Sequence, residues 1–397
     1  MNAWRTVRIA EFCTIGSGST PSRKKMDRYY EAGTIPWVKS GELREAVIHK
    51  TEEHVTEAAL KETNIKLVPV GAILLAMYGA TVGRLGILGV SASTNQAVCH
   101  ILPDPKIVEG RYLFHALRNQ VAGLIRRGVG GAQPNISQGI IREISLPIPP
   151  LSAQRRIVDL LDQAEALRAK RRAALAQLDI FTESIFLDLF GDPTTNSKGW
   201  PNTTSLGEIA DIVSGVAKGR NLQGKGAREV AYMAVANVQD LSLNLSVIKR
   251  IEATEEEIQQ YKLIPNDLLL TEGGDPDKLG RGTLWNNEVP ECIHQNHIFR
   301  VRLTSTDVHP LFLNWLVGSR RGKRYFLRSA KQTTGIASIN MTQLREFPML
   351  LPPLALQQEF AKRVNAVEKV KAAHRCSRDE MDSLFASLQH RAFQGRL

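Results

Sequence analysis

The chain has 397 residues, of which 43% are hydrophobic and 23% are charged, and its formal net charge is +11. This composition excludes a generally disordered chain and is sufficient to bury two cores of ordinary domain size. The four cysteines are too few and too scattered for a disulfide framework, and residues 1–12 lack the apolar core of a secretory signal. We therefore expect a folded, multidomain protein of the cytoplasm.

The first half of the chain has the pattern of an α+β domain. Its longest uncharged stretch, 67–83, is interrupted by a proline and two glycines, which favours buried strands over a membrane-spanning helix. Strands are predicted over 71–78 and 83–88, joined by a glycine-rich turn. Helices predicted over 55–66 and 111–126 complete this domain.

A long helix is predicted to follow. Pro149 and Pro150 stand where a helix can begin but not continue, and Gly191-Asp192-Pro193 stops it. Between them, apolar residues recur at alternating spacings of three and four, interrupted only by Arg171, which is the pattern of a coiled-coil seam. The predicted seam consists of Ile157, Leu160, Ala164, Leu167, Ala174, Leu178, Phe181 and Ile185.

The second half repeats the pattern of the first. Strands are predicted over 267–272 and 280–285, so that Arg84 and Arg281 occupy corresponding positions just after a glycine-rich turn. Helices are predicted over 253–262 and 310–331.

A second long helix is predicted after Pro352-Pro353. Its apolar stripe consists of Phe360, Val364, Val367, Met381, Phe385 and Leu388, but Lys371, His374 and Arg378 fall on the same line. A register shift through Val370, Ala373 or Leu384 would repair the stripe. Because either helix alone would expose its seam to water, we expect the two to pack as an antiparallel pair, with Leu167, Leu178, Val367 and Phe385 in its core.

The repetition extends to short motifs. Residues 146–154 (LPIPPLSAQ) recur as 350–357 (LLPPLALQ), and each copy opens a long helical pattern. A period of about 200 residues indicates two whole domains rather than a solenoid. The predicted organisation is a first domain over 1–150, a central helix over 151–190, a second domain over 191–353 and a C-terminal helix over 354–397.

Two windows carry cations without acids. No Asp or Glu lies between Glu109 and Glu143, or between Asp307 and Glu346. The first window contains Arg111, Arg118, Arg126, Arg127 and Arg142, and the second contains Arg320, Arg321, Lys323, Arg324, Arg328, Lys331 and Arg345. One such window is typical of a solvated basic face. Two at matching positions favour nucleic acid, because cations that neutralise phosphates release bound counterions.

Catalytic motifs are weak. Residues 219–226 resemble a phosphate-binding loop but have glycine where the Ser/Thr ligand of the metal should be. Cys292, His294 and His297 are close in sequence, yet no second cluster completes a metal site, so a strand with polar side chains is the favoured interpretation. Pro276-Asp277 lacks the Glu-x-Lys that would follow in a nuclease. The pattern predicts a chain that recognises nucleic acid without chemistry of its own.

Three motifs together resemble the specificity subunit of Type I restriction-modification systems. They are the repeated Pro-Pro-Leu-x-x-Gln before each long helix, the Phe190-Gly191-Asp192-Pro193 junction and the ending 392–397 (AFQGRL), and the resemblance covers the whole chain. It implies an α+β fold class with a pseudo-twofold internal repeat: two tandem target recognition domains separated by two long antiparallel helices that form a coiled-coil spacer. Each domain would read one half of a bipartite sequence in double-stranded DNA.

The resemblance also implies partners and their cofactors. Two methylation subunits would methylate adenine with S-adenosylmethionine, and two motor and nuclease subunits would use ATP and magnesium. This chain would hold no cofactor or metal, have no catalytic residue and contact no membrane.

Loop side chains would then specify bases, and the two basic windows would contact phosphates. The predicted DNA-binding residues of the first half are Lys39, Ser40, Arg44, Tyr78, Arg84, Arg126, Arg127 and Gln133. Those of the second half are Asn237, Gln239, Lys278, Arg281, Arg320, Arg321, Lys323, Arg324, Lys331, Gln332 and Thr333. An ordinary surface or turn role is the alternative for each.

Two functions from other classes remain as alternatives. One is a single-chain restriction or modification enzyme with an unrecognised catalytic site, although no span is left over for a catalytic block. The other is a coiled-coil adaptor whose basic windows bind RNA. Methylation by the isolated chain would identify the first, and sequence-independent binding of single strands would identify the second.

Overall fold

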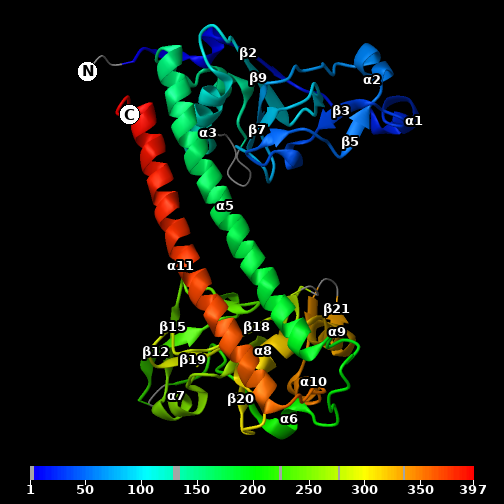
Figure 1. Cartoon of the computed structure of the whole chain (residues 1–397), viewed down its shortest axis with the longest axis vertical. Coiled ribbons are helices and arrows are strands. Elements are labelled where there is room, and N and C mark those ends of the chain that lie inside the picture. Colours follow the sequence, from blue (N-terminus) through cyan, green and yellow to red (C-terminus); the bar gives the residue numbers. More distant parts are fainter. Residues whose placement is uncertain (1–3, 128–134, 223–225, 276–277, 334–335) are drawn as a thin grey trace. The chain divides into compact units, whose positions relative to one another are not determined.

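The structure is a computed structural model (Figure 1). Apart from the side chains of Arg127, Gln332, Thr333 and Ile336, it describes residues 4–127, 135–222, 226–275, 278–333 and 336–397. Contacts divide the chain into two compact units. Unit 1 comprises Met1–Ala173 and Arg375–Leu397, and unit 2 comprises Ala174–His374. Each unit therefore contains one globular part and about half of each long helix, whereas the predicted boundaries set the helices apart from the globular domains.

The globular part of unit 1 is an α+β fold. Its strands are β1 (Thr6–Arg8), β2 (Cys13–Ser17), β3 (Ile35–Val38), β4 (Val47–Ile48), β5 (Glu53–Val55), β6 (Ile73–Ala76), β7 (Leu85–Leu88), β8 (Ser93–Thr94), β9 (Val98–Pro103) and β10 (Ser145–Pro147). Its helical segments are η1 (Ile9–Glu11), η2 (Arg23–Lys25), α1 (Met26–Tyr29), η3 (Ser40–Glu42), α2 (Glu57–Glu62), α3 (Gly110–Arg127) and α4 (Gln138–Arg142). The strands form sheets of order β2-β9-β6-β7-β4, β5-β3-β8 and β1-β10.

The globular part of unit 2 is built in the same way. Its strands are β11 (Ala210–Ser214), β12 (Arg228–Met233), β13 (Val238–Gln239), β14 (Ser242–Leu243), β15 (Lys249–Ala253), β16 (Leu268–Thr271), β17 (Gly273–Gly274), β18 (Gly282–Leu284), β19 (Cys292–His294), β20 (Ile298–Leu303), β21 (Lys331–Thr333) and β22 (Ile336–Ser338). Its helical segments are α6 (Leu206–Ile209), η4 (Val235–Asn237), α7 (Glu255–Tyr261), α8 (Pro310–Gly318), α9 (Arg320–Ser329) and α10 (Met341–Arg345). The sheets have the orders β11-β20-β16-β18, β15-β12-β19, β13-β14 and β17-β22-β21.

The sheet topology confirms the internal repeat. The order β2-β9-β6-β7 of unit 1 recurs in unit 2 as β11-β20-β16-β18. The parallel pair β3/β8 and the antiparallel pair β3/β5 recur as β12/β19 and β12/β15. Strands β6 and β16 are buried along their whole length, and all their residues except Thr271 are apolar.

One predicted helix is wrong. The segment 310–331 forms two helices, α8 and α9, rather than one. Ser319 between them has an extended backbone, and its hydroxyl accepts a hydrogen bond from the Gly322 amide at 3.4 Å, which caps α9. Lys331 lies in strand β21.

The two long helices are α5 (Leu151–Phe190) and α11 (Leu354–Phe393), each of 40 residues. In unit 2, Asp179 of α5 pairs with Lys371 of α11 at 2.8 Å, and the Phe186 ring centroid lies 5.4 Å from that of Phe360. Residue numbers thus rise along α5 as they fall along α11, which confirms the antiparallel pairing. Within the described residues, no helix is long and apolar enough to cross a membrane.

The predicted seam of α5 is only partly correct. Ile157 and Ile185 are buried, but Leu160, Leu167 and Phe181 expose 37%, 53% and 55% of their surfaces. Leu161 and Thr182, each one residue after an exposed predicted position, are buried instead, and Val158 and Phe186 are buried beside Ile157 and Ile185. Leu167 therefore does not belong to the helix core.

The stripe of α11 is buried at Phe360, Val364, Val367 and Phe385, as predicted. The predicted repair through Val370, Ala373 or Leu384 is wrong, because all three side chains are exposed. Lys371 instead stays on the buried face of α11, where its ammonium pairs with both Asp179 and Glu368 at 2.8 Å. A buried cation with two carboxylate partners can stay on the seam, so the register need not shift.

The Pro-Pro-Leu-x-x-Gln motif has a physical role that its sequence did not predict. In unit 1, Gln154 is fully buried at the start of α5. Its amide nitrogen donates to the carbonyls of Ile107 and Pro149 at 3.0 and 2.8 Å, and its amide oxygen accepts from the Glu109 backbone N–H at 2.8 Å. This one side chain joins the first turn of α5 to the segment that leads into α3.

Gln357 repeats every one of these bonds in unit 2. Its amide nitrogen donates to the carbonyls of Asp307 and Pro352 at 3.1 and 2.8 Å, and its oxygen accepts from the His309 backbone N–H at 2.8 Å. The glutamine therefore fixes each long helix to its globular part.

Candidate nucleic-acid interface

In unit 2, three of the predicted DNA-binding residues gather around the turn between β13 and β14. Leu241 in this turn has a left-handed backbone (φ 53°), and its N–H donates to the Gly282 carbonyl at 2.9 Å, which ties the turn to β18. Arg281 precedes Gly282, and its Nη1 donates to Oε1 of Gln239 at 2.8 Å. Lys323 of α9 pairs with Asp240 at 2.6 Å. Gln239, Arg281 and Lys323 therefore belong to one surface.

Gln239 holds the Arg281 guanidinium in place. The amide nitrogen of Gln239 donates to the Ala236 carbonyl at 2.9 Å, which fixes the amide so that its oxygen faces Arg281. The Arg281 Nε is buried without a hydrogen-bond partner among the described residues. A guanidinium fork in a fixed orientation is suited to bidentate contacts with a guanine edge.

Unit 1 repeats this frame with different side chains. Glu45 has the same left-handed backbone (φ 53°), and its N–H donates to the Leu85 carbonyl at 2.9 Å, as that of Leu241 does to Gly282. The carbonyls of Arg84 and Arg281 accept from the backbone amides of Ala76 and Thr271, both at 2.9 Å. This confirms that Arg84 and Arg281 occupy corresponding positions, and the Arg84 side chain is exposed.

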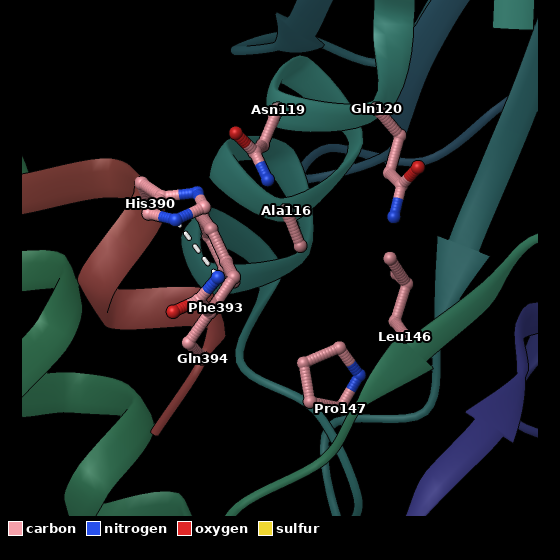
Figure 2. A pocket seen from close by; sticks show the side chains of 8 residues that line it. All are labelled: Ala116, Asn119, Gln120, Leu146, Pro147, His390, Phe393 and Gln394. Atoms are coloured by element: carbon pink, nitrogen blue, oxygen red, sulfur yellow. Dashed lines mark hydrogen bonds between the residues drawn. The ribbon is translucent and has the colours of Figure 1, made fainter. Parts of the chain in front are cut away.

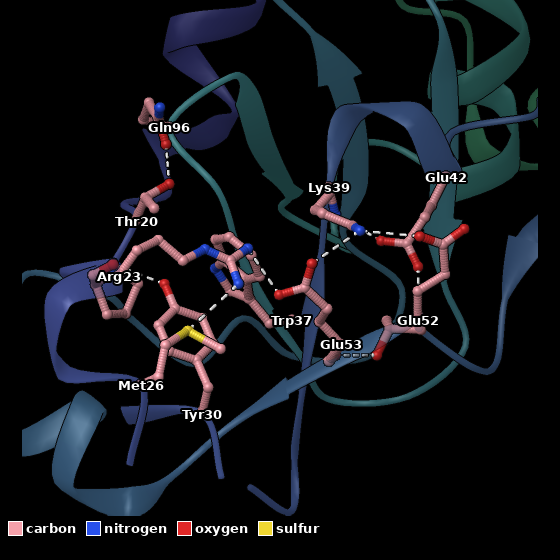
Figure 3. A network of polar contacts seen from close by, with 12 residues as sticks. Thr20, Arg23, Met26, Tyr30, Trp37, Lys39, Glu42, Glu52, Glu53 and Gln96 are labelled. Carbon is pink, nitrogen blue, oxygen red and sulfur yellow. Dashed lines mark hydrogen bonds and ion pairs between the residues drawn. The ribbon is translucent and has the colours of Figure 1, made fainter. Parts of the chain in front are cut away.

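A charged network surrounds Lys39 in unit 1 (Figure 3). The Lys39 ammonium contacts Glu52 at 2.8 Å and Glu53 at 3.0 Å, and its hydrogen bond lowers the pKa of the Glu52 carboxyl. Arg23 pairs with Glu53 at 2.7 Å, and its guanidinium lies 4.4 Å from the Tyr30 ring centroid. Lys39 is therefore engaged with carboxylates, which can themselves accept hydrogen bonds from base amino groups.

The network members Arg23, Glu52 and Glu53 were missed by the sequence analysis. The three residues come from η2, from the segment before β5 and from β5 itself, and no spacing in the sequence brings them together. Of the predicted residues near them, Ser40 begins η3 and is half-buried, and Arg44 is exposed.

Asn237 is not available to DNA, so its predicted role is wrong. The residue is 5% exposed, and its amide nitrogen donates to the carbonyls of Asn244 and Val247 at 2.7 and 2.9 Å. Its oxygen accepts from the Ala234 backbone N–H at 2.8 Å. Asn237 therefore shapes the loop that carries Gln239.

Arg321 contacts the backbone within unit 2. Its guanidinium donates to the carbonyls of Pro193 and Pro348 at 3.4 and 3.2 Å, and burial lowers its pKa. Lys278 pairs with its neighbour Asp275.

Some cations of the two basic windows pair with acids that lie outside the windows. In the first window, Arg111 pairs with Asp162 of α5 at 2.6 Å, and Arg118 pairs with Glu165 of α5 at 3.1 Å. In the second window, Lys323 is paired with Asp240. The acids come from segments far away in sequence. Among the predicted DNA-binding residues of the two windows, the exposed ones are Arg126 on α3, Arg320 and Arg324 on α9, and Lys331 on β21.

The other predicted positions are placed as follows. Tyr78 follows β6 and is half-buried. Arg127 ends α3, and Gln332 and Thr333 lie in β21, but their side chains are outside the described part of the structure. Gln133, Pro276-Asp277 and the centre of the 219–226 loop also lie outside it.

The sequence around Cys292 is a strand, as the favoured interpretation predicted. Cys292 and His294 are buried in β19, whereas His297 is exposed and contacts Glu272 at 2.6 Å. The described residues contain no group of three or more His, Cys, Asp or Glu side chains that could hold a metal ion.

His294 predicts a pH dependence of stability. Burial, with a smaller effect of Arg300, lowers its pKa to about 4, below the ordinary value of about 6.5. The unfolded state therefore binds the proton more tightly, so the contribution of His294 is present above pH 6.5 and is lost as the pH falls toward 4. We expect urea unfolding between pH 7.5 and 4 to show a loss of up to roughly 3 kcal/mol from this group. His294→Asn should flatten this slope, and an unchanged slope would contradict the assignment.

Comparison with known proteins follows the same division of the chain. The family described as "Type I restriction modification DNA specificity domain" matches residues 1–177 and 198–376. The StySPI specificity subunit of Salmonella potsdam, a Type I restriction enzyme subunit, is 24% identical, over 99% of this chain and 89% of that protein. The EcoKI specificity subunit of Escherichia coli is 21% identical with the same coverage.

Solved structures are similar in fold. The S subunit of a Type I restriction-modification system from M. genitalium aligns with a TM-score of 0.53 at 13% identity, over 99% of this chain and 96% of that one. A chain from a structure titled for the assembly and conformational transition of the type I R-M system aligns with a TM-score of 0.56 at 17% identity, over 100% and 99% of the two chains.

Proposed function

The chain belongs to the Type I restriction-modification DNA specificity family, and from this premise we propose that each unit reads one half of a bipartite DNA target. As a member of this family it is a DNA-recognition subunit and not an enzyme. The observation that carries the proposal is a backbone arrangement that the two units share around Arg84 and Arg281. Corresponding backbone groups make the same hydrogen bonds in both units, but the side chains around them differ. One frame with two sets of side chains is suited to reading two different short sequences.

The two surfaces favour different base contacts. In unit 2, Gln239 orients the guanidinium of Arg281, which suits the O6 and N7 acceptors of guanine. In unit 1, the carboxylates of Glu52 and Glu53 suit the amino groups of cytosine or adenine, while the exposed side chain of Arg84 suits a guanine. We therefore expect the two half-sites to differ in sequence.

The exposed arginines of α9 supply phosphate contacts. Arg320→Ala combined with Arg324→Ala is expected to weaken binding to all DNA sequences and to reduce the slope of log K against log salt by about 2, since each phosphate contact contributes about 0.9. Fluorescence anisotropy across a salt series measures this slope.

A matched double variant on the edge strand β15, Lys249→Ala with Arg250→Ala, removes the same formal charge. Its slope should stay close to that of the wild type. If the α9 variant and the wild type had the same slope of log K against log salt, α9 would not contact the phosphates.

Catalysis would be carried out by partner subunits. We propose two methylation subunits that use S-adenosylmethionine and two motor and nuclease subunits that use ATP and magnesium, all acting in the cytoplasm. Exposed apolar side chains on the long helices suit their docking, because large apolar groups in water favour a protein partner. These are Leu167 and Leu384 in unit 1 and Ile180 and Phe181 in unit 2, each more than half exposed. Comparing adenine methylation in host genomes with and without this chain tests the proposal.

A further inference from the structure

Glu45 in unit 1 and Leu241 in unit 2 share a backbone conformation that is unusual for both residue types. Each has a φ of 53°, in the left-handed region that glycine adopts without steric cost. Among the described residues other than glycine that have a positive φ, asparagine is the most frequent, and it tolerates this conformation better than glutamate or leucine does. Glycine would serve the fold better at both positions, so the two side chains need an explanation outside the fold.

The sheet register shows that the two residues occupy corresponding places. The N–H of Glu45 donates to the Leu85 carbonyl and that of Leu241 to the Gly282 carbonyl, both at 2.9 Å. Leu85 and Gly282 end corresponding ladders of paired residues. Across β2, β9, β6 and β7 the ladder is Ser17, Cys99, Leu75 and Leu85, and across β11, β20, β16 and β18 it is Ser214, Phe299, Leu270 and Gly282.

Both side chains are exposed beside an arginine. Leu241 exposes 42% of its surface, and Glu45 is also exposed. Each accepting carbonyl belongs to the residue that directly follows Arg84 or Arg281 in the chain. A Cβ on Gly318 would lie 3.8 Å from Cδ2 of Leu241, so the leucine rests against the end of α8. The Glu45 carboxylate has no hydrogen bond or ion pair to any described residue, so its oxygens are available as acceptors.

We propose that this shared position reads one base pair in each half-site, with Glu45 accepting from the amino group of a cytosine and Leu241 contacting the methyl group of a thymine. The inference rests on the proposed function and adds a second base contact beside each arginine. A carboxylate matches the N4 donor of cytosine, whereas a leucine forms no hydrogen bond and matches the thymine methyl. One backbone conformation thus presents opposite chemistry in the two units.

Deoxyuridine in place of thymine tests the contact of Leu241, because it removes only the methyl group. Anisotropy with the full chain and its mapped target should show one thymine, in one half-site, whose replacement weakens binding about fourfold, the effect of one buried methyl-sized group. Leu241→Gly should bind both DNAs equally. Its urea midpoint should stay close to that of the wild type, because relief of the left-handed backbone offsets the lost packing.

Leu245 provides the matched control for Leu241. It lies in the same segment and exposes 37% of its surface. Leu245→Ala should therefore keep the discrimination between thymine and deoxyuridine.

An exchange of side chains tests the contact of Glu45. Glu45→Leu copies the residue of unit 2 and should change the preference at one base pair of the other half-site from cytosine to thymine. Gln120→Leu makes a similar change elsewhere in unit 1, since Gln120 lines a small pocket between α3, β10 and the end of α11 (Figure 2). This control should leave the preference unchanged.

The contact of Leu241 is overturned if the wild type binds thymine and deoxyuridine equally at every position, or if Leu241→Gly keeps the discrimination. An unchanged base preference in Glu45→Leu overturns the contact of Glu45. Failure of the wild type itself to prefer a two-block target would be a different result, because it contradicts the proposed function and this inference with it.

Discussion

Replacing Gln357 by leucine is expected to destabilise unit 2 by about 2–4 kcal/mol, because one buried carbonyl and two partly exposed backbone groups lose their partner, and a buried group left unpaired costs about 1–3 kcal/mol. Leucine has a similar volume, so the loss comes from hydrogen bonds rather than from packing. The groups left unpaired are the His309 amide and the carbonyls of Asp307 and Pro352. Urea unfolding measures the loss, and hydrogen exchange of the α8 amides assigns it to unit 2.

Gln358 provides the matched control, because it is the exposed neighbour of Gln357 on the same helix turn. Gln358→Leu should change the free energy of unfolding by less than about 0.5 kcal/mol. Gln154→Leu should repeat the loss in unit 1, with faster exchange in α3 instead of α8. Equal stability of the Gln357 and Gln358 variants would show that the glutamine does not fix the helix.

Replacing Arg281 by alanine is expected to weaken binding of the target DNA by about 1–3 kcal/mol, or roughly 5- to 150-fold, and to relax specificity in one half-site only. Gln239 holds the guanidinium in one orientation, so less conformational entropy is lost when it meets a guanine edge. Arg281→Lys keeps the charge but loses the fork, and it should lose discrimination while keeping much of the non-specific affinity.

Arg84→Ala is the companion variant in unit 1 and should relax the other half-site. Anisotropy with DNA substituted one base pair at a time measures both effects. Relaxation of the same half-site by both variants, or an equal loss of affinity for every sequence, would contradict the assignment of one unit to each half.

The fold was predictable because the chain repeats itself. Two copies of one strand pattern, each followed by Pro-Pro and a helical pattern, indicate two domains and two helices without any knowledge of contacts. The seam of α5 was less predictable, since a spacing of three and four fits two neighbouring stripes. Leu160 and Leu161 both suit a seam by sequence, and only packing against the globular part buries Leu161 rather than Leu160.

The candidate site was predictable in its loops but not in all its side chains. Arg281 was identified because it follows a glycine-rich turn at the position that corresponds to Arg84. Asn237 was misassigned because an asparagine in a loop can either read a base or bind the backbone, and its three backbone contacts depend on residues up to ten positions away. The pairing of the first basic window could not be predicted from the local sequence. Asp162 and Glu165, which pair with two of its arginines, lie about fifty residues farther along the chain.

The most direct test of two-part recognition is the adenine methylation pattern of a host genome, mapped with and without this chain while the methylation subunits stay intact. The proposed function predicts one methylated motif of two short blocks separated by a constant gap, present only with the chain. In the presence of Arg281→Ala, one block should loosen and the other should remain. A motif that does not depend on the chain, or a single continuous block, would contradict recognition by two units.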